Sequence, residues 1–130
     1  MSHQIRTGLE HVNLTVPDAQ KTAQNLIDIF GWRIRWQGPA LNGGHVVHVG
    51  DEDSYVALYT PKEITGAVSI NKARALHLNH IGVVVDDLDD VEKRVINKGF
   101  RPNNHDNYEP GRRFYFDDDD GLEVEVVSYA

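Results

Sequence analysis

Residues 9–18 read LEHVNLTVPD, and residues 78–87 read LNHIGVVVDD. Both stretches begin Leu-x-His, continue as an apolar-rich run and end at an Asp. Their histidines, His11 and His80, are separated by an offset of 69 (80 − 11). Self-similarity at a fixed offset is the signature of an internal repeat. The sequence therefore predicts that one structural module occurs twice.

The agreement continues beyond these two stretches. Each is followed by a helical pattern that is closed by a glycine, Gly31 in the first copy and Gly99 in the second. Glycine is the residue expected just past the end of a helix. From there a constant offset of 68 superposes the last strand-like runs, residues 55–59 and 123–127. The shared order of elements favours a genuine duplication.

Hydrophobic periodicity assigns the same order of elements to both copies. The predicted elements are strands at 9–16, 32–37, 45–49 and 55–60 with a helix at 19–30, then strands at 80–85, 101–104, 112–116 and 122–128 with a helix at 88–98. The predicted fold class is α+β, built from two βαβββ modules. The first module covers residues 1–60, a polar linker covers 61–77, and the second module covers 78–130.

Composition narrows the classes of function. The 130 residues carry a formal net charge of −7, which argues against nucleic acid or an anionic membrane as the partner. The absence of cysteine excludes disulfides, thiolate catalysis and cysteine-based metal centres. No apolar run resembles a signal peptide or a membrane span, so a soluble cytoplasmic protein is expected. Any metal must be bound through nitrogen and oxygen.

Three residues form a candidate metal site. His11 and His80 occupy the same position in the two copies, so a pseudo-two-fold axis would let their imidazoles face each other. Glu125 lies near the centre of the last strand of the second copy. A lone strand histidine is more often structural, but two symmetric histidines with a carboxylate favour Fe(II), with Mn, Zn, Ni or Co also suitable. The symmetric partner of Glu125 is Ala57, so no fourth ligand is expected there.

These features resemble the vicinal oxygen chelate superfamily, which includes glyoxalase I, extradiol dioxygenases, fosfomycin-resistance thiol transferases and bleomycin-binding proteins. The resemblance rests on the His-centred first strands, the paired modules and the run YFDDDDGLEVE at 115–125. The family's turn reads Asp-Pro-Asp-Gly, with a ligand Glu four residues past the Gly. Here Asp119 replaces the Pro, and Glu125 follows Gly121 by four. The resemblance implies curved mixed sheets around a cavity, with the helices outside.

The resemblance also implies a metalloenzyme that chelates neighbouring substrate oxygens. The three-ligand set best fits an extradiol dioxygenase, with Tyr115 as a catalytic residue and His105 either its partner or a loop residue. A glyoxalase-type lyase or isomerase is an alternative, weakened by Ala57. A fosfomycin-type thiol transferase is another, weakened by Asn13 where a hydroxyl residue is usual. A non-catalytic drug-binding protein is the third.

Four residues are predicted to contact a small-molecule substrate. Arg113 and His45 fall on equivalent strands in the repeat and are expected to face the cavity with Tyr115. Arg113 could clamp a carboxylate or phosphate. Tyr59 shares the face of Ala57 and could fill the space there, and Asn13 is the fourth residue. A homodimer is expected from the resemblance.

Overall fold

The computed structural model describes residues 4–65, 70–108 and 111–130. It divides into two compact units: unit 1 comprises Met1–Ile27 and Gly31–Ile64, and unit 2 comprises Asp28–Phe30 and Thr65–Ala130. The boundary falls inside the predicted linker 61–77, of which residues 66–69 lie outside the described residues. No helix among the described residues is long and apolar enough to cross a membrane.

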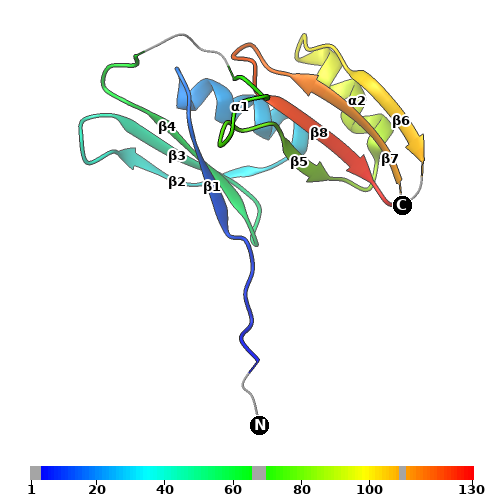
Figure 1. The fold of residues 1–130 in the computed structure, drawn as a ribbon, viewed down its shortest axis with the longest axis horizontal. Helices are drawn as coiled ribbons and strands as arrows, with labels where there is room; N and C mark the ends of the chain where they lie inside the picture. Colours follow the sequence, from blue (N-terminus) through cyan, green and yellow to red (C-terminus); the bar gives the residue numbers. More distant parts are fainter. Residues whose placement is uncertain (1–3, 66–69, 109–110) are drawn as a thin grey trace. The chain divides into compact units, whose positions relative to one another are not determined.

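The α+β class with two βαβββ modules is confirmed (Figure 1). The elements are β1 His11–Thr15, α1 Ala19–Phe30, β2 Arg33–Pro39, β3 His45–Gly50, β4 Tyr55–Thr60, β5 Ile81–Val84, α2 Leu88–Asn97, β6 Asn103–Tyr108, β7 Gly111–Asp117 and β8 Glu123–Ser128. Each module forms a 4-stranded sheet, with orders β1-β4-β3-β2 and β5-β8-β7-β6. The first strand of each module runs parallel to the last, and the other neighbours are antiparallel.

Local capping explains where the helices begin and end. Asp18 and Asp87 are the N-caps, and each side chain accepts a hydrogen bond from the backbone N–H three residues later, at 3.1 and 3.0 Å. Gly31 and Gly99 follow the helices with φ of 72° and 90°, a left-handed conformation that costs glycine least. The two glycines predicted to terminate the helices are therefore confirmed.

The sheet of unit 2 packs one face on α2, and the sheet of unit 1 contacts the start of α1 through Thr60. In β8, Val124 and Val126 are buried while Glu123 and Glu125 between them are partly exposed. The buried valines share their face with Phe114, and α2 contacts β7 and β8. We call the other face, which carries Glu125 in unit 2 and the equivalent Ala57 in unit 1, the polar face. The alternation of apolar and polar residues along the strands creates this division.

A tight turn joins β7 to β8 and places Glu125. The Asp118 carboxylate accepts hydrogen bonds from the backbone N–H groups of Asp120 and Leu122, both at 2.9 Å. Gly121 adopts a φ of 86°. Burial raises the pKa of Asp118, and its two hydrogen bonds oppose this rise. The turn therefore depends more on the acceptor oxygen of residue 118 than on its charge.

Asp118→Ala should lower the free energy of unfolding by about 1–3 kcal/mol, because two partly buried N–H groups lose their acceptor. Asp118→Asn retains a carbonyl acceptor and should lose clearly less. Urea unfolding of the three proteins measures this difference. Equal losses in both variants would show that the side-chain acceptor does not stabilise the turn.

Candidate metal-binding site

Three predicted site residues meet on the polar face of unit 2. The Nε2 atom of His80 lies 3.0 Å from Oε1 of Glu125, and Nη1 of Arg113 donates to Oε2 of Glu125 at 2.9 Å. The side chains of Glu125 and Arg113 are each 13% exposed, and that of His80 is 33% exposed. The two carboxylate oxygens thus have different partners, which holds the carboxylate in one orientation.

Strand register explains this convergence. Glu125 on β8 pairs with Gly82 on β5 and with Tyr115 on β7, and paired residues carry their side chains on the same face. His80 immediately precedes β5, two residues before Gly82, and therefore points to that face as well. The Tyr115 ring meets the His80 ring edge-on at 5.7 Å. The structure thus brings His80, Glu125, Tyr115 and Arg113 together.

The equivalent face of unit 1 holds three other predicted residues. His11 pairs with Tyr55, and the two rings stack at 4.8 Å. Asn13 pairs with Ala57, the position equivalent to Glu125, and Tyr59 lies two residues along the same face. The structure places His11, Asn13 and Tyr59 together on the polar face of unit 1.

His48 on β3 occupies the position equivalent to Tyr115 on β7. The constant offset of 68 would instead give Val47 (115 − 68). His48 pairs with Ala57 as Tyr115 pairs with Glu125. Nine positions separate the first pair and ten the second (57 − 48 and 125 − 115), because the β7–β8 turn is one residue longer. A slip of one residue moves every side chain of a strand to the opposite face.

His45 lies on the helix side of its sheet as a result. It pairs with Thr60, and its Nε2 atom is 3.3 Å from Nε2 of Gln20 on α1. The register does not place His45 with the other predicted substrate residues, and His48 lies on the polar face instead. The alternation of side chains along β4 could not have revealed the position of His48, because the register between β3 and β4 depends on the length of the turn that joins them.

Four rings form a row across the polar face of unit 1. His48 stacks on Tyr55 at 4.6 Å, and Trp36 contacts His48 at 5.2 Å, extending the His11–Tyr55 stack. The guanidinium of Arg35 lies 4.6 Å from the centre of the Tyr55 ring. Burial lowers the pKa of His48, and repulsion from His11 and Arg35 lowers it further. This environment favours the neutral imidazole at position 48.

His105 lies in a strand and away from Tyr115. It sits in β6, its Nε2 atom is 3.1 Å from Oε1 of Glu92 on α2, and its ring stacks on the buried Phe114 at 5.8 Å. These contacts belong to the helix side of the sheet, whereas Tyr115 is on the polar face. His105 is therefore neither a loop residue nor placed to act with Tyr115.

The predicted ligands are shared between the units. His80 and Glu125 belong to unit 2, and His11 belongs to unit 1. Over residues 4–65, 70–108 and 111–130, no group of three or more histidine and acidic side chains is assembled to hold a metal ion. Two of the three predicted ligands, His80 and Glu125, are thus in direct contact with each other within unit 2.

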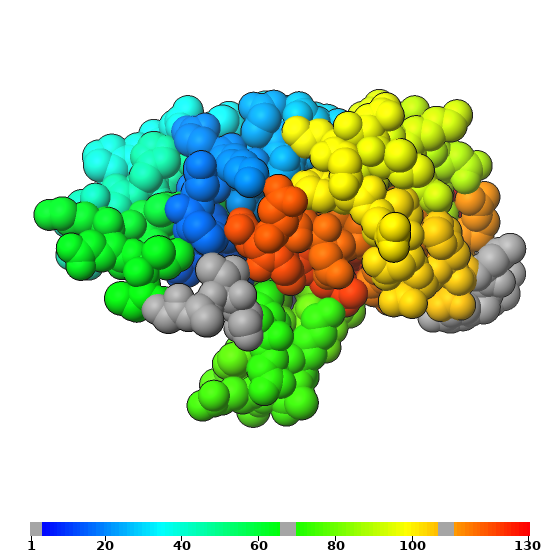
Figure 2. All heavy atoms as spheres, turned by 90° about the horizontal axis from the view of Figure 1, so that it is seen from above, coloured from blue at the N-terminus to red at the C-terminus, as the bar shows by residue number. Residues whose placement is uncertain are grey.

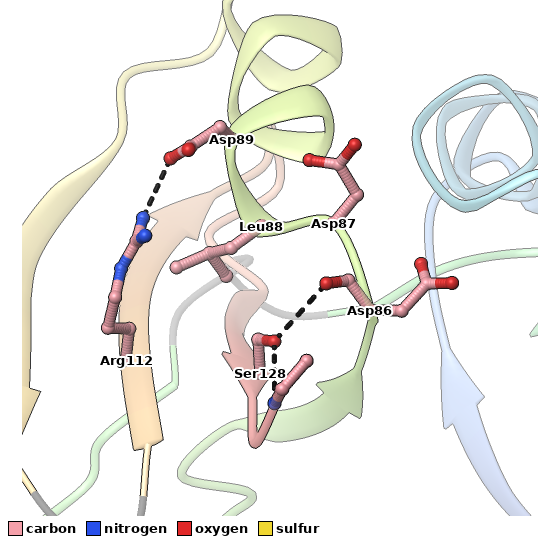
Figure 3. A pocket seen from close by; sticks show the side chains of 7 residues that line it. Asp86, Asp87, Leu88, Asp89, Arg112 and Ser128 are labelled. Atoms are coloured by element: carbon pink, nitrogen blue, oxygen red, sulfur yellow. Dashed lines mark hydrogen bonds and ion pairs between the residues drawn. The ribbon is translucent and has the colours of Figure 1, made fainter.

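Unit 2 has two further surface features, one beside this site and one away from it. Residues 70–77 are exposed and project from unit 2 (Figure 2), and Lys72 forms a 2.6 Å ion pair with Glu123 on the polar face. A hollow of about 330 Å³ lies where α2 begins (Figure 3). Its walls include the 2.7 Å ion pair between Arg112 and Asp89. The hollow contains none of the predicted site residues.

The chain thus has paired βαβββ modules, with a histidine–carboxylate pair on the polar face of unit 2. The chain belongs to the Glyoxalase/Bleomycin resistance protein/Dioxygenase superfamily, whose family model matches residues 8–126. The family resemblance predicted from the sequence is confirmed. No curated protein sequence matches the chain significantly.

Solved structures share the fold over nearly the whole chain. A glyoxylase/bleomycin resistance protein/dioxygenase domain from Frankia sp. EAN1pec is 20% identical with a TM-score of 0.78, covering 95% of this chain and 98% of that one. The fosfomycin resistance protein FosX from Listeria monocytogenes, complexed with Mn(II) and sulfate, is 19% identical with a TM-score of 0.69, covering 95% and 93%. TnmS3, an antibiotic binding protein from Streptomyces sp. CB03234, is 18% identical with a TM-score of 0.71, covering 98% and 100%.

The His48 environment predicts an NMR titration result. His48 should titrate below the usual pKa of 6.5, and Arg35→Gln should raise its pKa because one repelling charge is lost. Between the folded and unfolded pKa values the unfolded chain binds more protons, so the free energy of unfolding falls as the pH drops below about 6.5. His48→Gln should reduce that fall. Lys93→Gln in unit 2 makes the same change of charge and serves as the control. A His48 pKa that is unchanged in Arg35→Gln would contradict the assignment of repulsion to Arg35.

Proposed function

We propose that the protein is a metal-dependent enzyme that binds one divalent ion through His80, Glu125 and His11. Its substrate is a small molecule with two neighbouring oxygen atoms. The observation that carries this proposal is the contact between Nε2 of His80 and Oε1 of Glu125 on the polar face of unit 2. His11, on the polar face of unit 1, is the third ligand that the repeat predicts.

The spacing of the two atoms fits a metal. Imidazole nitrogen and carboxylate oxygen bind divalent ions at about 2.1 Å, so two adjacent ligands of an octahedral ion lie about 3.0 Å apart. His80 Nε2 and Glu125 Oε1 are 3.0 Å apart. A hydrogen bond has the same length, so this distance is compatible with a metal and does not require one. The donor set of nitrogen and oxygen suits Fe(II) and Mn(II).

Neighbouring residues hold this pair in place. Arg113 occupies Oε2 of Glu125, which directs Oε1 towards His80. A buried carboxylate needs such compensation, because burial of an unpaired charge is strongly unfavourable. We therefore infer that Arg113 orients Glu125. We further infer that Tyr115 contacts a substrate oxygen, since its ring lies beside His80.

The reaction class is argued from the ligand set and from the residues beside it. A bound metal would polarise substrate oxygens and stabilise a developing anion. The three-ligand set favours Fe(II)-dependent cleavage of a catechol. However, His105 contacts α2 and is not placed to assist Tyr115. Glyoxalase-type isomerisation and thiol addition to an epoxide are therefore to be assayed beside ring cleavage, each with Fe(II)-loaded and Mn(II)-loaded protein.

Elemental analysis and calorimetry test the metal site. Protein purified without a histidine tag should bind about one equivalent of Mn(II) or Fe(II). His80→Ala removes one ligand and Glu125→Gln removes the negative charge of another, so each should weaken binding by at least the roughly 10- to 100-fold that loss of a ligand's hydrogen-bond partner costs. His11→Ala tests the third ligand in the same way, and His105→Ala serves as the matched histidine control. Wild-type protein that binds no metal, or a His80→Ala variant that binds normally, would refute the proposal.

Binding without turnover is a second candidate function. The ring row of His11, Tyr55, His48 and Trp36 offers stacking surface for an aromatic ligand. TnmS3, with a similar fold, is an antibiotic binding protein. Tight binding of an aromatic antibiotic by metal-free protein, lost in Trp36→Ala, would favour this candidate over the enzyme.

A homodimer with a small-molecule ligand completes the proposal. Analytical ultracentrifugation at several concentrations determines the oligomeric state. A monomer at all concentrations would remove the dimer from the proposal without affecting the metal site.

A further inference from the structure

The residue before each predicted ligand histidine contacts that histidine. Oδ1 of Asn79 lies 2.8 Å from Nδ1 of His80, and Oε1 of Glu10 lies 2.9 Å from Nδ1 of His11. Both contacts are made by Nδ1. In His80 the other ring nitrogen, Nε2, faces Glu125 and the proposed metal position. The two nitrogens of His80 therefore have separate tasks.

An acceptor at Nδ1 determines which form of a neutral imidazole is present. When Nδ1–H donates a hydrogen bond, the lone pair is left on Nε2 and the ring cannot rotate freely. Histidines that bind metals almost always donate their other N–H to a carboxylate, a carbonyl or water, and loss of that partner typically weakens metal binding by about 10- to 100-fold. The side-chain oxygens of Asn79 and Glu10 are acceptors of this kind.

The repeat provides a second instance of the contact. Asn79 and Glu10 each immediately precede their histidine, so they occupy equivalent positions in the two copies. One is an amide and the other a carboxylate, yet each places an oxygen at almost the same distance from Nδ1. The shared feature is thus a hydrogen-bond acceptor rather than a particular residue.

We infer that Asn79 is a positioning residue that holds His80 with Nε2 available to the metal, and that Glu10 does the same for His11. This inference rests on the proposed metal site. It assigns to the two residues a role in metal affinity, exerted through the histidines. Glu10 also lies 3.4 Å from the hydroxyl of Tyr55, which donates to its Oε1, so Asn79 is the cleaner position for a test.

The test compares Asn79→Leu with Asn79→Asp. Leucine has a similar size and no acceptor, whereas aspartate retains an oxygen acceptor at the same place. Zn(II) affinity, measured by competition with a chelator, should fall about 10- to 100-fold in Asn79→Leu and stay equal or rise in Asn79→Asp. In the Zn(II)-loaded protein, ¹⁵N NMR should detect a protected Nδ1–H of His80 in wild type and Asn79→Asp, and an exchange-broadened one in Asn79→Leu.

The thermal unfolding midpoint of the metal-free proteins separates positioning from folding. We expect it to be nearly unchanged in both variants, because Asn79 is exposed. Glu10→Leu and Glu10→Gln repeat the comparison at His11. Wild-type protein that fails to bind Zn(II) would overturn the proposed function together with this inference. Normal Zn(II) affinity and a protected Nδ1–H in Asn79→Leu, with wild-type binding intact, would overturn this inference alone.

Discussion

The Glu125 carboxylate, held between His80 and Arg113, is the contact on which the account of this protein depends. This carboxylate is 13% exposed and is compensated by the Arg113 guanidinium on one oxygen, while Nε2 of His80 lies 3.0 Å from the other. Each partner comes from a different part of the sheet, and β8 lies between them. Sheet topology thus determines which side chains reach this carboxylate.

The two modules share their architecture and differ in the side chains on their polar faces. Both have the same strand order, and both begin with a histidine whose Nδ1 contacts the preceding side chain. At the next level they diverge, because Glu125 corresponds to Ala57. Ala57 carries no charge that an arginine would compensate, and unit 1 carries stacked rings on the equivalent face. One module therefore provides a charged face and the other an aromatic one.

The sequence predicted the fold well because its signals are local: a repeated strand, capping Asp residues and helix-ending glycines all act within a few positions. The same holds for Glu125, whose place follows from the turn at Gly121. Prediction failed where register decides, as with His45, because a turn that differs by one residue reverses a strand's faces. The contact of Asn79 with His80 was also missed, since it depends on side-chain rotamers rather than on pattern.

The most direct test of the central claim is a crystal structure of the Mn(II)-soaked protein with anomalous diffraction data. We expect a single strong anomalous peak within about 2.3 Å of both Nε2 of His80 and Oε1 of Glu125. A peak elsewhere and none at Glu125, or no peak at all, would contradict the claim that this carboxylate is a metal ligand.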